Sequence, residues 1–261
     1  QTIQVSDTEV PLFADVPADA DVQCNAVPLP DLPTATDNCD PNVQIDFTEN
    51  ITAGSCPSAF TVTRTWVATD NCGNSSQVIQ TIRVSDTEAP LFGSLPADIE
   101  VQCNAVPLPA ILTATDNCDP NVQIDFSETI TPGTCPGAYT ITRTWTATDN
   151  CGNSSQALQT INVSDTEAPS ITCPSNISVT TALDSSTVSG LDLSPVLSDN
   201  CGINTLKYVL TGATEYSSAD SGLNDATGAA FHVGTTTLTY TVVDNCGNSA
   251  FCAVTVVVNS N

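Results

Sequence analysis

The chain has 261 residues with 29 acidic and 4 basic side chains, which gives a formal net charge of −25. Nucleic acids and anionic membranes bind clustered cations, so neither is expected as a partner. No apolar run reaches the roughly 18 residues that a membrane-spanning helix needs, and the sequence predicts no membrane insertion.

The chain is built from repeats. Residues 5–83 (repeat 1) and 84–162 (repeat 2) align without a gap at a period of 79, and 59 of these 79 positions are identical. Residues 163–261 (repeat 3) open with the same V-S-D-T-E-A-P and carry D-N-C-G-N near their end. Residues 1–4 match the close of repeat 1, which predicts that they end a preceding repeat. Self-similarity at a fixed period indicates a tandem array.

Short β-branched segments punctuated by Pro and Gly recur along repeat 1, at residues 20–24, 43–47, 60–68 and 77–84. Bulky and threonine side chains alternate within 60–68, so Phe60, Val62 and Trp66 are expected on the core face. No segment has a helical apolar period. The pattern predicts an all-β fold of tandem β-sandwich domains.

Arg64 and Arg143 fall on the same core-facing register as these bulky residues. One interpretation is a buried guanidinium paired with Asp46 and Asp125, respectively. The other is an arginine that extends past the neighbouring tryptophan to the sheet edge.

Twelve cysteines fall four to a repeat. An even number in a repeat of about 80 residues indicates disulfides, an oxidising compartment and a secreted or cell-surface protein. Zinc is the alternative, but the first two repeats contain no His and their cysteines are 15 to 17 residues apart, unlike the close pairs of zinc sites.

No catalytic pattern is present. The chain has no G-x-S-x-G, no serine with a partnered histidine and no glycine-rich phosphate loop. Paired carboxylates are expected by chance among 29 acidic residues. The sequence therefore predicts a protein that is not an enzyme.

Repeat 3 contains I-T-C-P-S-N-I-S-V, S-D-N-C-G-I and a long segment from H-V-G-T-T-T-L to F-C-A-V-T-V-V-V. These motifs resemble the hyalin repeat (HYR) family. Repeats 1 and 2 resemble the related V-Q-C-N and T-W-T-A-T-D-N-C-G-N repeats of surface proteins that gliding bacteria export by the type IX route. The resemblance implies an immunoglobulin-like fold, extracellular placement and a role in adhesion or as a spacer, although fold motifs transfer architecture better than function.

The resemblance also implies a disulfide pairing within each repeat, because the second and sixth strands of such a sandwich end at one pole. The implied pairs are Cys24–Cys56, Cys39–Cys72, Cys103–Cys135, Cys118–Cys151, Cys173–Cys252 and Cys201–Cys246.

In the same geometry, the D-N-C loops face the D-T-E linker that enters the repeat. Calcium takes six to eight oxygen ligands, which such an acidic cluster could supply. The alternative is that these side chains only form turns by accepting backbone amides. The expected calcium ligands are Asp7, Glu9, Asp37, Asp40 and Asp70 for repeat 1, Asp86, Glu88, Asp116, Asp119 and Asp149 for repeat 2, and Asp165, Glu167, Asp199 and Asp244 for repeat 3.

The leading functional hypothesis is a structural segment of an extracellular stalk, adhesin or filament, in contact with adjoining repeats or other copies of itself. Near-identical consecutive units favour it, since a stalk needs copies whereas a binding site needs only one. The alternatives are a module in which repeat 3 binds glycans or proteins, and a spacer attached to a secreted hydrolase.

Overall fold

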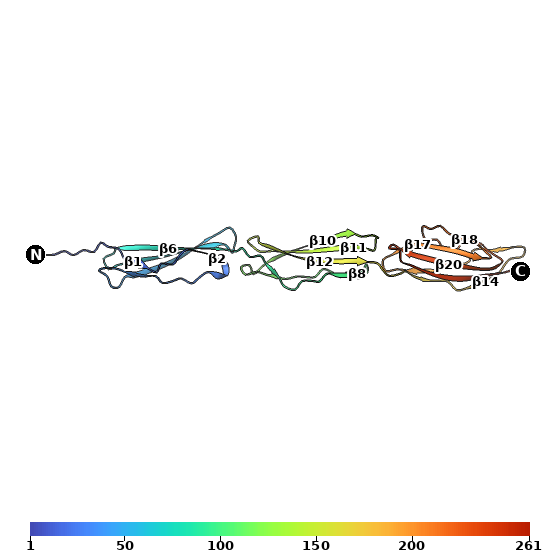
Figure 1. Ribbon diagram of the computed structural model, residues 1–261, viewed down its shortest axis with the longest axis horizontal. Coiled ribbons are helices and arrows are strands. Elements are labelled where there is room, and N and C mark those ends of the chain that lie inside the picture. The colour runs from blue at the N-terminus through green and yellow to red at the C-terminus, as the bar shows by residue number, and fades with distance from the viewer. The chain divides into compact units, whose positions relative to one another are not determined.

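A computed structural model describes residues 1–261, and every regular element except one short 3-10 helix is a β-strand (Figure 1). The all-β expectation is confirmed. None of the helical structure is long and apolar enough to cross a membrane.

Repeat 1 forms a four-stranded sheet, β2-β6-β5-β4, and a two-stranded sheet, β1-β3. The short strand β2 lies parallel to the last strand, β6, whereas β4, β5 and β6 are antiparallel. The strands are β1 (Leu12–Ala14), β2 (Ala20–Gln23), β3 (Thr34–Thr36), β4 (Gln44–Ala53), β5 (Phe60–Thr69) and β6 (Ser75–Ser85).

Repeat 2 has the same arrangement, with the sheets β8-β12-β11-β10 and β7-β9. Its strands are β7 (Leu91–Phe92), β8 (Ile99–Gln102), β9 (Ala114–Thr115), β10 (Gln123–Pro132), β11 (Tyr139–Thr148) and β12 (Ser154–Ser164).

Repeat 3 has a five-stranded sheet, β14-β21-β20-β17-β18, and the two-stranded sheets β13-β16 and β15-β19. Its strands are β13 (Ser170–Thr172), β14 (Ile177–Thr180), β15 (Thr187–Val188), β16 (Val196–Ser198), β17 (Ile203–Gly212), β18 (Tyr216–Ser217), β19 (Phe231–His232), β20 (Gly234–Asp244) and β21 (Ser249–Asn259).

The cores differ in size. Alternate residues of β5 are buried, among them Val62 and Trp66, as the alternation predicts. The main cluster of repeat 1 nevertheless contains only three buried residues, Val62, Ile82 and Val84, whereas that of repeat 3 contains twelve. Repeats 1 and 2 are therefore sandwiches with small cores, and such domains need covalent support.

Arg64 and Arg143 are buried, so the hypothesis of an arginine extending to the sheet edge is wrong. Their partners also differ from those proposed. Arg64 Nε donates to Glu49, 2.8 Å away, because Glu49 and not Asp46 lies opposite it on β4. Arg143 pairs with Glu128 at 2.8 Å, in place of Asp125. In each case a second nitrogen donates to a proline carbonyl.

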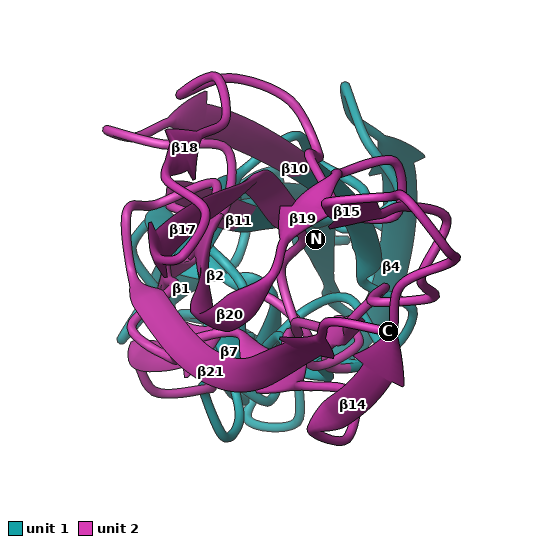
Figure 2. Cartoon of the chain, turned by 90° about the vertical axis from the view of Figure 1, so that its right-hand side faces the viewer, with its two compact units in different colours: residues 1–95, 111–127, 144–157 teal, residues 96–110, 128–143, 158–261 magenta.

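The chain divides into two compact units (Figure 2). Unit 1 comprises residues 1–95, 111–127 and 144–157, and unit 2 comprises residues 96–110, 128–143 and 158–261. The strands of repeat 2 thus contribute to both units. The junction between repeats 1 and 2 lies wholly within unit 1, and that between repeats 2 and 3 lies wholly within unit 2.

Candidate functional site

The disulfides join consecutive repeats. Four of the five bonds run from the first or third cysteine of one repeat to a D-N-C cysteine of the next, and the bonded Cα atoms are 5.1 to 5.8 Å apart, an ordinary separation. The four are Cys24–Cys118, Cys56–Cys151, Cys103–Cys201 and Cys135–Cys246.

The pairing implied by the isolated sandwich is therefore wrong in five of six cases: Cys24–Cys56, Cys39–Cys72, Cys103–Cys135, Cys118–Cys151 and Cys201–Cys246. The physical reason is that the two cysteines at one pole bond to the adjoining repeat rather than to each other, and Cys39 and Cys72 remain free. The sixth pair, Cys173–Cys252, is present and closes repeat 3 on itself.

A signal of this arrangement was present in the sequence. Repeat 3 keeps both D-N-C cysteines, Cys201 and Cys246, but its other two cysteines bond to each other. Cys173 and Cys252 depart from the spacing of repeats 1 and 2, and they replace the pair that bonds to the next repeat there.

Close packing accompanies the bonds. The Ser58 hydroxyl lies 3.2 Å from the Cys118 carbonyl and 3.0 Å from the Asn150 side-chain oxygen. At the equivalent position of repeat 2, a Cβ added to Gly137 would lie 2.9 Å from Cβ of Asp165 and 3.1 Å from the Cys246 sulfur. The next repeat approaches this position closely in both cases, and the residues found there, Ser58 and Gly137, are small.

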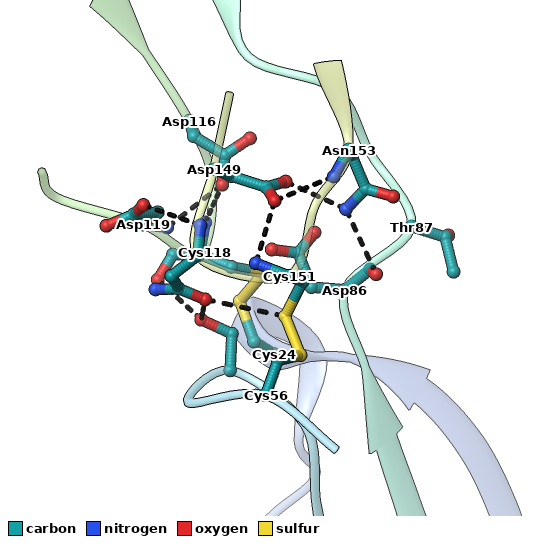
Figure 3. The surroundings of a disulfide bond; sticks show 12 residues. Cys24, Cys56, Asp86, Thr87, Asp116, Cys118, Asp119, Asp149, Cys151 and Asn153 are labelled. Carbon is teal, nitrogen blue, oxygen red and sulfur yellow. Dashed lines mark hydrogen bonds between the residues drawn. A yellow bond between two sulfur atoms is a disulfide. The ribbon is translucent and has the colours of Figure 1, made fainter. Parts of the chain in front are cut away.

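The D-N-C-G-N loop holds its cysteine by turn chemistry (Figure 3). In repeat 2, one Asp149 oxygen accepts the backbone amides of Cys151 and Asn153, and the other accepts the Asn153 side chain. Gly152 has φ +92°, a conformation that favours glycine. The loop thereby presents the cysteine in a fixed position.

Repeats 1 and 3 each gather three aspartates where the linker meets these loops, and repeat 2 gathers two. In repeat 3, oxygen atoms of Asp165, Asp199 and Asp244 lie within 4.8 Å of one another, and Asp86 and Asp116 approach equally closely in repeat 2. The Cys118 sulfur is also near, but it is tied in a disulfide and offers no thiolate. The equivalent residues of repeat 1 are Asp7, Asp37 and Asp70.

Several of these carboxylate oxygens are buried without a hydrogen-bond partner. Asp86 and Asp165 are each only 7% exposed. Oδ2 of Asp86, Oδ2 of Asp116 and both carboxylate oxygens of Asp165 have no partner. Buried polar atoms are normally hydrogen-bonded, whereas these oxygens have no partner within the chain.

Electrostatics separates the aspartates into two classes. Burial and the nearby Asp116 and Asp149 carboxylates raise the pKa of Asp86 above its usual value. Burial also acts to raise the pKa of Asp149, but hydrogen bonds from Asn153 and the backbone outweigh it and lower that pKa. The charged form of Asp86, in the linker, is therefore destabilised, whereas the charged form of Asp149, in the loop, is stabilised.

The remaining residues predicted as calcium ligands make other contacts or are exposed. Asp40 and Asp119 are buried, but their oxygens accept backbone amides, as the turn alternative predicts. Glu9 accepts the Asn38 side chain at the surface. Glu88 and Glu167 are exposed and lie outside the three close groups.

A separate pocket of about 400 Å³ lies in repeat 3. Two tyrosines and two acids contribute to its lining, Tyr208, Tyr216, Glu215 and Asp225. Tyr216 is 54% exposed and stacks at a tilt on Tyr208, with ring centroids 5.6 Å apart.

The four disulfides between repeats predict which tryptic fragments stay joined. The chain is denatured without reduction, and its free thiols are blocked before digestion. Trypsin cuts after Arg64, Arg83, Arg143 and Lys207. Fragment 65–83 contains only Cys72, which is free, so it is expected to be released alone while the other four fragments stay joined. Mass spectrometry before and after reduction measures this. Fragments 1–64 and 65–83 leaving together, apart from the rest, would instead establish pairing within repeats.

Comparison with known proteins covers nearly the whole chain. A model described as an HYR-like domain with four cysteines matches residues 12–84 and 94–163, and the HYR domain model matches residues 164–258. Hyalin of Strongylocentrotus purpuratus is 29% identical over 210 residues, which cover 76% of this chain and 16% of hyalin. The chain thus spans about a sixth of that relative.

Solved cadherin structures show only a loose likeness. Mouse cadherin-23 EC22-24 is 13% identical with a TM-score of 0.40, covering 97% of this chain and 100% of that one. Drosophila N-cadherin EC1-4 is 15% identical with a TM-score of 0.34, covering 97% and 76%. Scores below 0.5 support no conclusion about this chain. The two family models do, and the chain belongs to the family of HYR-like domains with four cysteines, with an HYR domain as its third repeat.

Proposed function

We propose that this chain is an inextensible segment of an extracellular stalk, adhesin or filament, in which disulfides transmit tension from one repeat to the next. Membership of the HYR family and the disulfides fit an extracellular or surface protein, and the matched families are not catalytic. The V-Q-C-N and D-N-C-G-N motifs support placing the array on the surface of gliding bacteria that use the type IX route.

The observation that carries this proposal is the covalent path through the chain. From residue 1 the path can pass from Cys24 to Cys118, along the backbone to Cys135, and on to Cys246. It bypasses most of the β-strands. The disulfides therefore limit how far tension applied at the two ends can unravel the sheets, as a stalk or filament requires.

Stretching single molecules tests this function. The path contains about a fifth of the residues, so at about 3.4 Å per residue the oxidised chain should extend to about 200 Å and the reduced chain to about 900 Å. Replacing Cys173 and Cys252 by serine is the matched control, because that bond lies off the path and its loss should not change the oxidised length. Equal extension before and after reduction would refute the proposal.

We further propose that calcium occupies the aspartate cluster of each repeat. Asp86 and Asp165 supply buried oxygens without partners, and neighbouring carboxylates add more within 4.8 Å. Calcium prefers carboxylate and carbonyl oxygens in flexible geometry, and it would neutralise charges that otherwise repel. The cation would stiffen the segment at the same junctions that the disulfides join.

Calorimetric titration of the whole chain with calcium chloride tests these sites. The three clusters predict three bound ions, and Asp86→Asn is expected to weaken one of them at least tenfold because it removes a charged, buried ligand. Glu100→Gln is the control, with the same change in charge on an exposed residue outside the clusters. No heat at millimolar calcium, or equal binding by the two variants, would leave these loops as turns only.

The pocket of repeat 3 favours a second candidate function, recognition of a glycan or a peptide. An exposed tyrosine beside two acids offers a stacking face and hydrogen-bond acceptors to a sugar or a cationic side chain. Array binding that maps to repeat 3 and falls tenfold or more in Tyr216→Ala would support this function. Binding unchanged by that substitution, or none at all, would remove it.

A further inference from the structure

Repeat 1 carries an unused copy of the face that receives a preceding repeat. In repeats 2 and 3, both D-N-C cysteines are bonded to the repeat before them. Their counterparts in repeat 1, Cys39 and Cys72, are exposed and free. This is a matched pair of thiols at positions that form bonds at both other junctions.

The receiving face of repeat 1 already has the geometry of the bonded one. Asp37 Oδ1 accepts the amide of Cys39 at 2.9 Å, as Asp116 Oδ1 accepts that of Cys118 at 2.8 Å. Cys72 donates its thiol to the side-chain oxygen of Asn71 at 3.4 Å. The equivalent atoms of repeat 2 are also 3.4 Å apart. The loops are therefore formed without a partner.

The receiving faces differ in how far a preceding repeat covers them. Asp7 of repeat 1 is partly exposed, whereas its counterparts Asp86 and Asp165 are buried. In repeat 2, the Ser58 hydroxyl of the preceding repeat lies against the Cys118 carbonyl and the Asn150 side chain.

A second copy of this chain offers no free cysteine equivalent to Cys24 or Cys56. The cysteines that point onward from repeats 1 and 2 are already bonded, and repeat 3 has none, since Cys173 and Cys252 bond to each other. The occupant must carry two free cysteines equivalent to Cys24 and Cys56. A further HYR-like repeat with four cysteines meets this requirement.

We propose that Cys39 and Cys72 form the receiving face for another four-cysteine HYR-like repeat. That repeat bonds both thiols and buries the aspartate group of repeat 1, Asp7, Asp37 and Asp70. The incoming counterpart of Cys24 bonds Cys39, and that of Cys56 bonds Cys72. Each bond joins two thiols with loss of two protons and two electrons, which reduce one disulfide oxidant such as oxidised glutathione to two thiols. This inference deepens the proposed function, and its test is a disulfide map that does not depend on the stretching measurement.

The experiment lengthens the chain by one repeat. A copy of residues 5–83 is placed before Val5 at the natural period, with its own counterparts of Cys39 and Cys72 changed to serine, and the protein is oxidised with glutathione disulfide. No free thiol should remain. After trypsin, fragment 65–83 should stay linked to the added copy, whereas it is released from the 261-residue chain.

The matched control has the counterparts of Cys24 and Cys56 in the added copy changed to serine as well. It should keep two free thiols and release fragment 65–83. The proposal is overturned if Cys39 and Cys72 bond to each other and the added copy leaves as a separate fragment. It is equally overturned if both thiols stay free beside the intact copy, or if the 261-residue chain forms head-to-head dimers through them.

Discussion

The disulfides between consecutive repeats are the constraint on which the rest of this molecule depends. They close loops with sequence separations of 94 to 111 residues. On the chain-entropy model, a loop of about 100 residues contributes about 4.7 kcal/mol by restricting the unfolded chain. That contribution is large beside the 5 to 15 kcal/mol of net stability of ordinary domains. The loops overlap, so their contributions are not additive.

This constraint accounts for the unequal cores. Repeats 1 and 2 bury small clusters around Val62 and Ile141, and both are covalently tied to a neighbour. Repeat 3 buries twelve residues in its main cluster and has its own bond, Cys173–Cys252. Repeat 3 therefore combines an internal bond with the largest core cluster of the three repeats, in addition to its two bonds to repeat 2.

The strands were predictable because alternation along one strand is a local property. Trp66 and Val62 lie in the core as their spacing indicates. The partner of Arg64 was not predictable, because the register between β4 and β5 decides it, and a shift of three residues replaces Asp46 with Glu49. The turn-forming aspartates were predictable in the same local way, whereas the aspartate groups join residues 30 or more positions apart and were expected only from the family resemblance.

The cysteine pairing failed for a different reason. Treating each repeat as a closed sandwich confines the possible partners to one period, whereas Cys24 pairs across 94 residues with Cys118. A period of 79 with identical cysteine positions cannot distinguish a bond within a repeat from a bond to the next repeat. Only the departure of repeat 3 from the pattern breaks that symmetry, and it does so at Cys173 and Cys252, which replace the pair that bonds to the next repeat in repeats 1 and 2.

The D-N-C loops carry both the bonded cysteines and aspartates of the acidic groups. The disulfides stabilise the junction between repeats, whereas repulsion between the carboxylates destabilises it. Two carboxylates 4.8 Å apart repel by about 3 kcal/mol at an effective dielectric constant of 20, so one pair already approaches the contribution of one disulfide. Burial and this repulsion together raise the pKa of Asp86, and a proton relieves both. A divalent cation at the proposed site would relieve the repulsion and also bind the oxygens that have no partner. The covalent bonds hold the junction closed in either state, so charge neutralisation can tune its stiffness without releasing one repeat from the next.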